Sequence, residues 1–304
     1  MKINNDPKIS QAFAYLKNLK YTDTDIQEIC KDYIIADYLG KNYIGTSKLL
    51  PIIKTKQKNK SKFKISYTKN TFKIDAKGEF LAVIMKKHLS NILKKANNNN
   101  ISVLLVKNAK TTPLPSVYSY LATKENLMVF SCMFIPSKTV VMPNLLTPMF
   151  DTNPISIGIP LGNNKGFIFD FSVAESAIAK ISILEKFNGL TKNLSITNDK
   201  SEIKYLFPFG NIKGFNFGIL TLMLAGILND KDVFLEEDYK NKKEASFFYL
   251  FINANFLEKN YKMKMLKMLK KIYKESGSYY HIPGEKYEKA FNNLKKYFNY
   301  YFEK

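Results

Sequence analysis

Two apolar runs near the middle of the chain constrain its fold most strongly. Residues 101–106 read ISVLLV and residues 127–134 read LMVFSCMF, so neither run shows the regular alternation of a strand with one wet face. A strand that is apolar on both sides is covered on both faces of its sheet, usually by helices. The sequence therefore predicts an α/β fold built on a sheet with flanking helices.

The flanking segments show the expected alternation of strands and helices. Helical spacing of apolar residues is present in residues 7–19, 23–39, 79–96, 116–122, 175–187, 213–228, 260–275 and 284–302. Strand patterns are present in a hairpin over residues 62–75 and in residues 155–159, 167–171 and 247–252. We therefore divide the chain into an N-terminal helical segment (1–60), an α/β core (61–255) and C-terminal helices (256–304).

The charge balance bears on the choice of partner. The 304 residues carry a net charge of +21, and every basic residue counted is lysine, with no arginine and no tryptophan. An excess of this size attracts polyanions, but the planar guanidinium that reads guanine is absent. Lysine is also scattered along the whole chain. We expect no specific nucleic-acid partner.

Cysteine, histidine and hydropathy exclude several further classes. Cys30 and Cys132 cannot form a disulfide framework, and with His88 and His281 they lack zinc-ligand spacing, so no metal site is expected. The first ten residues have no apolar signal region, and no run approaches the roughly 20 apolar residues of a membrane span. These features predict a cytoplasmic protein with no membrane partner. No P-loop is present, and no GxGxxG motif follows a strand.

Three short strings rich in Gly, Pro and Asn stand out from the rest of the chain. Residues 151–160 combine a turn with a strand, and residues 281–285 open a helix. The string 208–214 also leads into a helix, so that Lys213 and backbone amides converge at a helix N-terminus, where anions bind well. Taken singly, each string is more typical of a structural turn than of a site.

In their order along the chain, these strings resemble the type-2 malate/L-lactate dehydrogenase family, which includes ureidoglycolate, sulfolactate and cyclic-imine-acid oxidoreductases. The matching segments are TNPISIGIP, GFIFDFSVAESAIAKI, LFPFGNIKGFNFGILTLMLAGIL, SFFYLFINANF and IPGE. Residues 36–48 resemble the family's ADxxGxxSHGxxR segment more faintly. The resemblance implies a non-Rossmann α/β fold with a mixed sheet, a helical subdomain formed by both termini, and a homodimer.

The resemblance further implies NAD or NADP as cofactor, and a small 2-oxo or imino acid that is interconverted with its 2-hydroxy or amino acid. Cofactor-binding residues would be Lys213, Gly210, Gly214, Asp170, Phe171, Ser172, Pro283, Gly284 and Glu285. Substrate-binding residues would be Lys48, Thr152, Asn153 and Pro154. Hydride passes directly between nicotinamide and substrate, so the protein must position both and move a proton.

The chain departs from the family pattern where that proton chemistry is expected. Ile44 and Thr111 stand where the resemblance calls for histidines, and neither can serve as a general acid. Lys48 replaces the arginine expected to hold the substrate carboxylate, which keeps the charge but loses the bidentate fork. The catalytic candidates that remain are Lys48 and Tyr43, with Lys41 and His281 as further groups within possible reach.

Two hypotheses follow from this sequence. The first is an NAD(P)-dependent oxidoreductase of altered specificity, in which another group replaces the lost histidines. The second is a catalytically inactive pseudoenzyme that keeps the fold as a ligand-binding or structural homodimer. An open, polar cavity around Ile44 and Thr111 would favour the first hypothesis, and a cavity plugged by side chains would favour the second.

Overall fold

A seven-stranded mixed sheet forms the centre of the protein. The computed structural model describes residues 7–54, 62–143, 145, 147–163, 165–176, 195–197, 203–231, 233, 244–276 and 282–302. The strands are β1 (Lys64–Tyr67), β2 (Thr71–Asp75), β3 (Ile101–Ala109), β4 (Leu127–Phe134), β7 (Ile155–Gly162), β8 (Lys165–Phe171) and β11 (Ala245–Asn253). Their order is β1-β2-β3-β11-β4-β7-β8, with β2 and β3 parallel and the other neighbouring pairs antiparallel.

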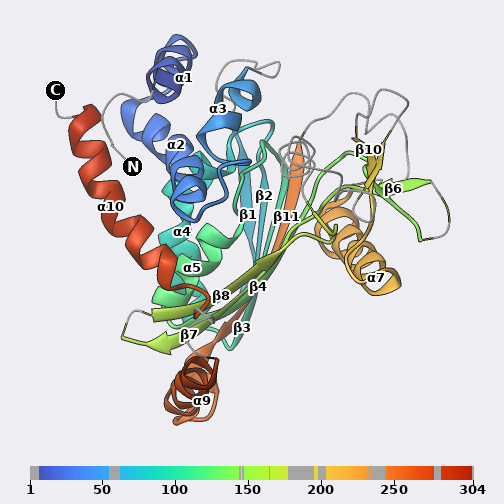
Figure 1. Cartoon of the computed structure of the whole chain (residues 1–304). Helices are drawn as coiled ribbons and strands as arrows, with labels where there is room; N and C mark the ends of the chain where they lie inside the picture. Colours follow the sequence, from blue (N-terminus) through green and yellow to red (C-terminus); the bar gives the residue numbers. More distant parts are fainter. Residues whose placement is uncertain are drawn as a thin grey trace.

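One face of this sheet is covered by helices (Figure 1). The helices on this side are α1 (Pro7–Asn18), α2 (Asp23–Tyr38), α3 (Thr46–Ile53), α4 (Leu81–Asn97), α5 (Ser116–Lys124) and α10 (Glu285–Phe302). Leu104 and Val106 of β3 point into the core beneath α4 and α5. Helix α2 packs on α4, and α10 packs on α2, so helices from the two ends of the chain lie side by side.

The other face of the sheet is covered mainly at one end. There helix α7 (Ile212–Thr221) and a small second sheet lie against it. The strands of the second sheet are β5 (Val140–Val141), β6 (Pro148–Phe150), β9 (Ser195–Thr197) and β10 (Ile203–Leu206), in the order β6-β5-β10-β9. Leu105 and Phe248 point into the core on this side. The central strands are thus buried on both faces over part of their length, and the predicted mixed α/β fold is confirmed.

The helix predicted over residues 213–228 is regular for only part of its length. It consists of α7 (Ile212–Thr221), a π-helical turn (Leu222–Gly226) and a 3-10 turn (Ile227–Asn229). The hydroxyl of Thr221 donates to the carbonyl of Gly218 at 2.6 Å, next to the point where the ladder changes. Residues 212–229 are the one described stretch whose length and apolarity would suit a membrane span, and a packed core helix satisfies the same criterion.

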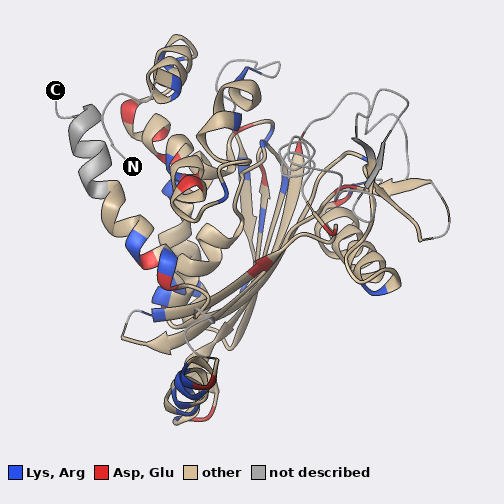
Figure 2. Ribbon diagram, viewed as in Figure 1, with Lys and Arg blue, Asp and Glu red and all other residues tan. Residues whose placement is uncertain are grey.

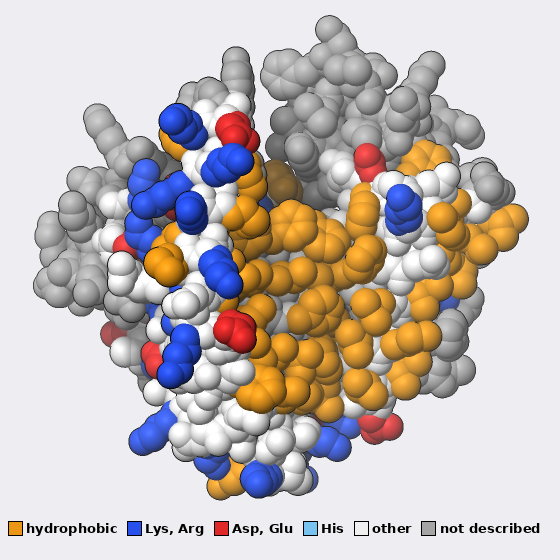
Figure 3. Space-filling model, turned by 90° about the horizontal axis from the view of Figure 1, so that it is seen from below, with side chains coloured by type: hydrophobic (Ala, Val, Ile, Leu, Met, Phe, Trp, Pro, Cys, Tyr) orange, Lys and Arg blue, Asp and Glu red, His pale blue; other side chains and the backbone are white. Residues whose placement is uncertain are grey.

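Beyond α7, a row of apolar side chains crosses the uncovered part of the sheet. Val103, Leu250, Phe130, Ile157 and Phe169 are paired in register across β3, β11, β4, β7 and β8, and each is half-buried or exposed. Figure 3 shows the broad apolar surface that results. We call this row and its surroundings the open sheet face.

Lysine is spread over many elements, as the sequence indicates. Figure 2 marks lysine positions in blue on the ribbon of α9 (Tyr261–Glu275), of α10 and of the strands at the β1 edge of the sheet. Helix α9 packs against β7 rather than against the N-terminal helices. The sequence missed α3, which carries Pro51 inside it, and the small second sheet. The helix predicted over residues 175–187 lies largely outside the described residues.

Candidate active site

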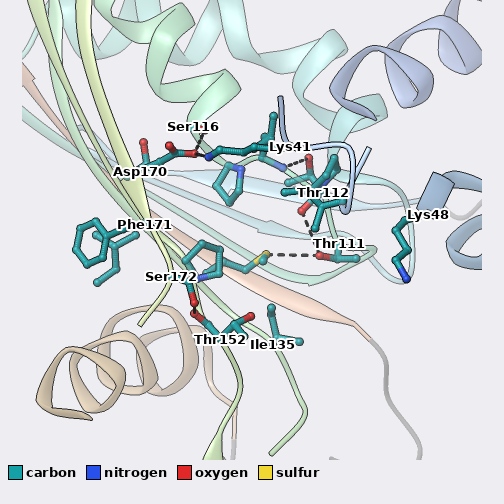
Figure 4. Close-up of a pocket in the computed structure, with 18 of the residues that line it drawn as sticks. Lys41, Lys48, Thr111, Thr112, Ser116, Ile135, Thr152, Asp170, Phe171 and Ser172 are labelled. Carbon is teal, nitrogen blue, oxygen red and sulfur yellow. Dashed lines mark hydrogen bonds and ion pairs between the residues drawn. The ribbon is translucent and has the colours of Figure 1, made fainter. Parts of the chain in front are cut away.

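A pocket of about 390 Å³ opens between the N-terminal helices and the edge of the large sheet. Its walls come from residues 41–52, from the loop 111–116 after β3, from residues 152–156 at the start of β7 and from residues 170–172 at the end of β8. This volume is typical of small-molecule sites. Segments far apart in the sequence therefore meet around one cavity (Figure 4).

Asp37 and Gly45 shape the wall formed by residues 41–52. The Asp37 carboxylate accepts hydrogen bonds from the backbone N–H and the hydroxyl of Thr46, at 3.2 and 2.6 Å, which caps the N-terminus of α3. A Cβ atom on Gly45 would lie 1.7 Å from Asp37 Oδ1, so any larger residue there would displace the Asp37 carboxylate. This local arrangement presents Tyr43, Ile44 and Lys48 to the pocket.

Four polar side chains form a connected network at one end of the pocket, which we call the closed end. Asp170 Oδ2 accepts from Lys41 Nζ at 2.7 Å and from Ser116 Oγ at 2.8 Å. The Tyr287 hydroxyl lies 2.5 Å from Ser116 Oγ and donates to the same carboxylate oxygen at 3.5 Å. The side chains of Lys41 and Asp170 are 28% and 19% exposed, so this ion pair is partly shielded from water.

The string around Gly284 positions Tyr287 within the closed end. The Pro283 carbonyl accepts from the backbone N–H of Ile168 at 3.1 Å, which ties the start of α10 to β8. Gly284 has φ of +109°, and a Cβ atom there would lie 2.0 Å from the Gly166 carbonyl oxygen. Gly284 is therefore required for this close approach, and Tyr287 follows one helical turn later.

Burial keeps the tyrosines of the site protonated. Burial first, and the nearby Asp170 carboxylate second, raise the pKa of Tyr287 well above its ordinary value. The same two causes raise the pKa of Tyr43. Both phenols therefore carry their protons at neutral pH, and the Tyr287 hydroxyl is hydrogen-bonded within the closed end.

The opposite end of the pocket, which we call the open end, is formed by Ile44, Lys48 and Thr111. Lys48 lies in the first turn of α3 and is exposed, and among the described residues it has no hydrogen-bond or ion-pair partner. Figure 4 shows its ammonium group pointing away from the Lys41–Asp170 pair. Thr111 donates weakly to the sulfur of Met133 at 3.6 Å. The space beside Ile44 and Thr111 is part of the cavity and is not plugged.

The predicted string Thr152-Asn153-Pro154 divides between the pocket and the core. Thr152 and Pro154 line the pocket, and the Thr152 carbonyl accepts from the Ser172 hydroxyl at 3.0 Å. Asn153 is fully buried: its side chain accepts from Ile135 N at 3.0 Å and donates to Thr221 Oγ1 at 3.0 Å. Asn153 therefore holds this wall in place rather than facing the cavity.

The glycine turn before α7 lies beside the pocket, not within it. Gly210 and Lys213 are exposed, whereas Gly214 is buried. A Cβ atom on Gly214 would lie 2.2 Å from the Phe209 carbonyl oxygen, so the turn requires glycine at this position. The amides of Asn211, Lys213 and Gly214 already donate to carbonyls within the turn, so the exposed Lys213 side chain is the group we consider for an anion. Phe171, which lines the pocket, contacts the Phe209 ring of this turn with centroids 5.5 Å apart.

Two further sequence candidates lie elsewhere. Gly284 and Glu285 line a second cavity of about 580 Å³ between α9, α10 and the β7–β8 hairpin. His281 is outside the described residues. Among the residues that are described, no group of three His, Cys, Asp or Glu side chains is placed to hold a metal ion.

A buried carboxylate supports the pocket wall from behind. Asp32 of α2 accepts from the hydroxyls of Thr112 and Tyr118, each at 2.8 Å, and no described residue donates to its other oxygen. Burial raises the pKa of Asp32 to about 6. Lys110, adjacent to Thr111, points away from the pocket and lies over the Phe80 ring, and burial lowers its pKa to about 8.

Sequence reasoning missed two of the four closed-end residues. Ser116 looked like an ordinary first residue of a helix, and Tyr287 looked like a core position of an amphipathic helix. A weak signal exists for Tyr287, since it follows the string at residues 283–285 by one turn. No local signal marks Ser116, because its role depends on β8 and α10.

Comparison with known proteins agrees with this architecture. The family model for malate/L-lactate dehydrogenase matches residues 9–296. A Δ1-pyrroline-2-carboxylate/Δ1-piperideine-2-carboxylate reductase from Pseudomonas aeruginosa is 26% identical over 166 residues, covering 51% of this chain and 49% of the reductase. The chain thus spans about half the length of the curated relatives it matches.

Solved structures show the same fold over nearly the whole chain. Malate dehydrogenase from Entamoeba histolytica aligns with a TM-score of 0.77 at 17% identity, covering 96% of each chain. The Δ1-piperideine-2-carboxylate reductase from Pseudomonas syringae pvar. tomato aligns with a TM-score of 0.75 at 14% identity, covering 96% of this chain and 97% of the reductase. The protein belongs to the malate/L-lactate dehydrogenase family of oxidoreductases.

Proposed function

We propose that this protein is an NAD(P)-dependent oxidoreductase that interconverts a small 2-oxo acid, or a cyclic imino acid, with its 2-hydroxy or amino acid. The observation that carries this proposal is the open pocket of about 390 Å³ beside Ile44 and Thr111. A purely structural member of the family that binds no ligand would have no need to keep that space clear of side chains. The pocket also combines a free lysine with an ion pair, which suits an anionic substrate with a polar reacting group.

Lys48 is the group we assign to the substrate carboxylate. It lines the pocket, is exposed and has no partner of its own among the described residues. A lysine meets a carboxylate as a point charge rather than as a bidentate fork, so this contact is less directional than that of an arginine. The Asp170 carboxylate at the far end disfavours a second anion there, which orients the substrate with its carboxylate toward Lys48.

The residues near the pocket fit a nicotinamide cofactor in part. A bound reduced nicotinamide would supply the hydride. The exposed Lys213 side chain provides a positive charge for a phosphate, and the rings of Phe171, Phe209 and Phe217 form a contiguous apolar surface between Lys213 and the pocket. NAD and NADP remain equal candidates, and Asp170, Phe171 and Ser172 are the pocket residues we assign to the nicotinamide end.

Thermal denaturation with NADH and with NADPH tests this function. A ligand at 100 times its Kd that binds only the folded state adds about 2.7 kcal/mol of stability. We expect one cofactor to raise the Tm, Lys213→Ala to abolish the rise, and Lys264→Ala, an exposed lysine of α9, to leave it unchanged. Pyruvate, oxaloacetate, glyoxylate and Δ1-piperideine-2-carboxylate are then screened by NAD(P)H absorbance. No Tm shift with either cofactor at millimolar concentration would contradict the proposal.

A catalytically inactive pseudoenzyme is the second candidate function. It is favoured by Ile44 and Thr111, which stand at the positions where the resemblance calls for histidines. A cofactor-induced rise in Tm without reduction of any screened substrate would support this candidate instead.

We propose that the protein acts in the cytoplasm.

We also propose that the open sheet face binds a second copy of the protein. A monomer rarely leaves a large contiguous apolar patch in water, and the row Val103, Leu250, Phe130, Ile157 and Phe169 contains no charge. A two-fold axis places the same apolar patch on both sides of an interface. Sedimentation analysis should show a dimer that Phe169→Lys dissociates and that Tyr67→Lys, at a distant exposed site, does not. A monomeric wild type would contradict this proposal.

A further inference from the structure

We propose that Lys41, held by Asp170, is the proton donor to the oxygen or nitrogen on C2 of the substrate. This inference rests on the proposed function and names the group that replaces the histidines expected at Ile44 and Thr111. Lys41 occupies neither of those two positions, because it lies in the loop that follows α2.

The backbone delivers Lys41 to the pocket by a defined helix end. Gly40, with φ of +78°, ends α2 in the left-handed conformation, and the Lys41 N–H donates to the Ala36 carbonyl at 2.8 Å. The side chain then extends across the pocket to Asp170 and Ser116, as Figure 4 shows. Its end is thus placed by an ion pair with Asp170, 129 residues away.

The geometry distinguishes Lys41 from the other candidates. Lys48 lies at the open end without a partner and points away from the closed end. Tyr43 lines the same pocket, but among the described residues no side chain holds its hydroxyl in place. Lys41 lines the cavity and its ammonium group is held at a fixed position by the ion pair, so it can reach a bound substrate as a general acid must.

Asp170 does more than hold the lysine in place. Ser116 donates to the same carboxylate oxygen at 2.8 Å and is itself in a short hydrogen bond with Tyr287, so this oxygen keeps the Ser116 donor when the lysine gives up its proton. The carboxylate therefore stays solvated by the protein throughout the step. Asp170, Ser116 and Tyr287 act here as positioning residues.

The proton transfer balances in the direction of reduction. A bound dihydronicotinamide would supply the hydride for the new C–H bond at C2, and the π electrons of the C=O or C=N bond would then go to the oxygen or nitrogen. That atom takes a proton from the Lys41 ammonium group, so an N–H bond breaks and a neutral amine remains. The cofactor is oxidised and the substrate reduced, and Lys41, whose side chain is 28% exposed, regains a proton from water.

A binding experiment tests the contact without relying on turnover. Oxamate carries a carboxylate and a carbonyl oxygen, whereas propionate carries only the carboxylate. By calorimetry with and without NADH, we expect Lys48→Met to weaken both ligands, and Lys41→Met to weaken oxamate about tenfold while leaving propionate unchanged. Equal weakening of the two ligands by Lys41→Met, or none, would overturn the inference.

A turnover experiment then separates proton donation from charge. Lys41→Met should lower kcat by about 10²-fold or more. Lys41→Arg keeps the charge and the ion pair with Asp170 but holds its proton too tightly, so it should retain oxamate binding and lose kcat to the same extent. Lys264→Met serves as the surface control.

The outcomes also separate this inference from the proposed function. If Lys41→Met reduces substrate as fast as the wild type, or if Lys41→Arg keeps its activity, the inference is overturned and the proposed function still stands. A wild type that binds neither cofactor and reduces no substrate overturns the function and the proton step together.

Discussion

The two ends of the pocket hold their lysines in different ways. At the closed end, Lys41 shares one carboxylate oxygen with Ser116 and Tyr287, and every member comes from a different element. At the open end, Lys48 stands in the first turn of a short helix with no partner among the described residues. A lysine placed by a network suits chemistry that needs a fixed atom, and an unpaired lysine suits the recognition of a charge. Two lysines in one cavity can therefore serve different purposes, one as a fixed chemical group and the other as a charge that recognises the substrate.

Removing the glycine that positions Tyr287 should disrupt the closed end most severely. In Gly284→Ala, a Cβ atom would lie 2.0 Å from a backbone oxygen at φ of +109°, so we expect a loss of about 3 kcal/mol or more in the free energy of unfolding. Gly210→Ala is the matched control, because its φ is also positive and nothing lies within 4 Å. It should cost about 1 kcal/mol. Urea denaturation measures both, and equal losses would show that the close approach at Gly284 does not matter.

The wall between the two ends depends on Asp32, and its effect should vary with pH. Its pKa is raised from 3.8 to about 6, so the folded state binds a proton between these values that the unfolded state does not. This group therefore adds stability as pH falls from about 7 to 4 and costs stability above that range. At about 1.4 kcal/mol per pKa unit, Asp32→Asn should stabilise the protein by up to about 3 kcal/mol at pH 8 and by little at pH 4.

The control for Asp32 is Asp230→Asn, since the Asp230 side chain is 91% exposed. The difference between this control and the wild type should stay flat across the same pH range. A flat difference for Asp32→Asn as well would mean that its carboxylate is not desolvated in the folded protein.

Tyr287→Phe tests the hydrogen-bonded character of the closed end more gently. The substitution removes the hydroxyl that lies 2.5 Å from Ser116 and keeps the ring. We expect a loss of about 1 kcal/mol in unfolding free energy, the usual value for a hydrogen bond. Tyr273→Phe, at a 43% exposed position on α9, should cost nothing measurable. Identical stabilities of the two variants would indicate that Tyr287 serves the closed end only through its ring.

The smallest expected effect comes from placing a histidine at the open end. If the proton donor is now Lys41, Ile44→His should change the rate of substrate reduction by less than about threefold in the wild-type background. In the Lys41→Met background the same histidine should restore about tenfold of the lost rate, because a second acid then has a role. A large gain in the wild-type background would place the missing acid at Ile44 and erase the difference between the two ends.

Much of the fold could be predicted because its signals are local. The hairpin over residues 62–75, the strand at residues 127–134 and the C-terminal helices are set by side-chain periodicity, and the structure confirms them. Helix α3 was missed because it is short and contains Pro51. The irregular end of α7 was missed because it depends on Thr221 and on its contact with Asn153, which lies in a distant turn.

The candidate site shows the same limit. Order and spacing of motifs led to Asp170, Ser172, Thr152 and Lys48, which the structure brings to one pocket. They did not reveal that Asn153 is turned into the core, or that Ser116 and Tyr287, 171 residues apart, share a hydrogen bond. Contacts across such separations leave no mark in local patterning.

The sequence alone was enough to predict the α/β class and to recognise the family resemblance. It also shows that arginine and the two expected histidines are absent. These depend on residue identity and on short-range periodicity, which can be read directly from the chain. The three-dimensional structure was needed to show that the pocket is open beside Ile44 and that Lys41 rather than Lys48 is paired with Asp170. It was also needed to show that the described residues leave part of one sheet face uncovered. Those properties arise from packing between distant segments, because burial and pairing are set by what the folded chain places next to each side chain.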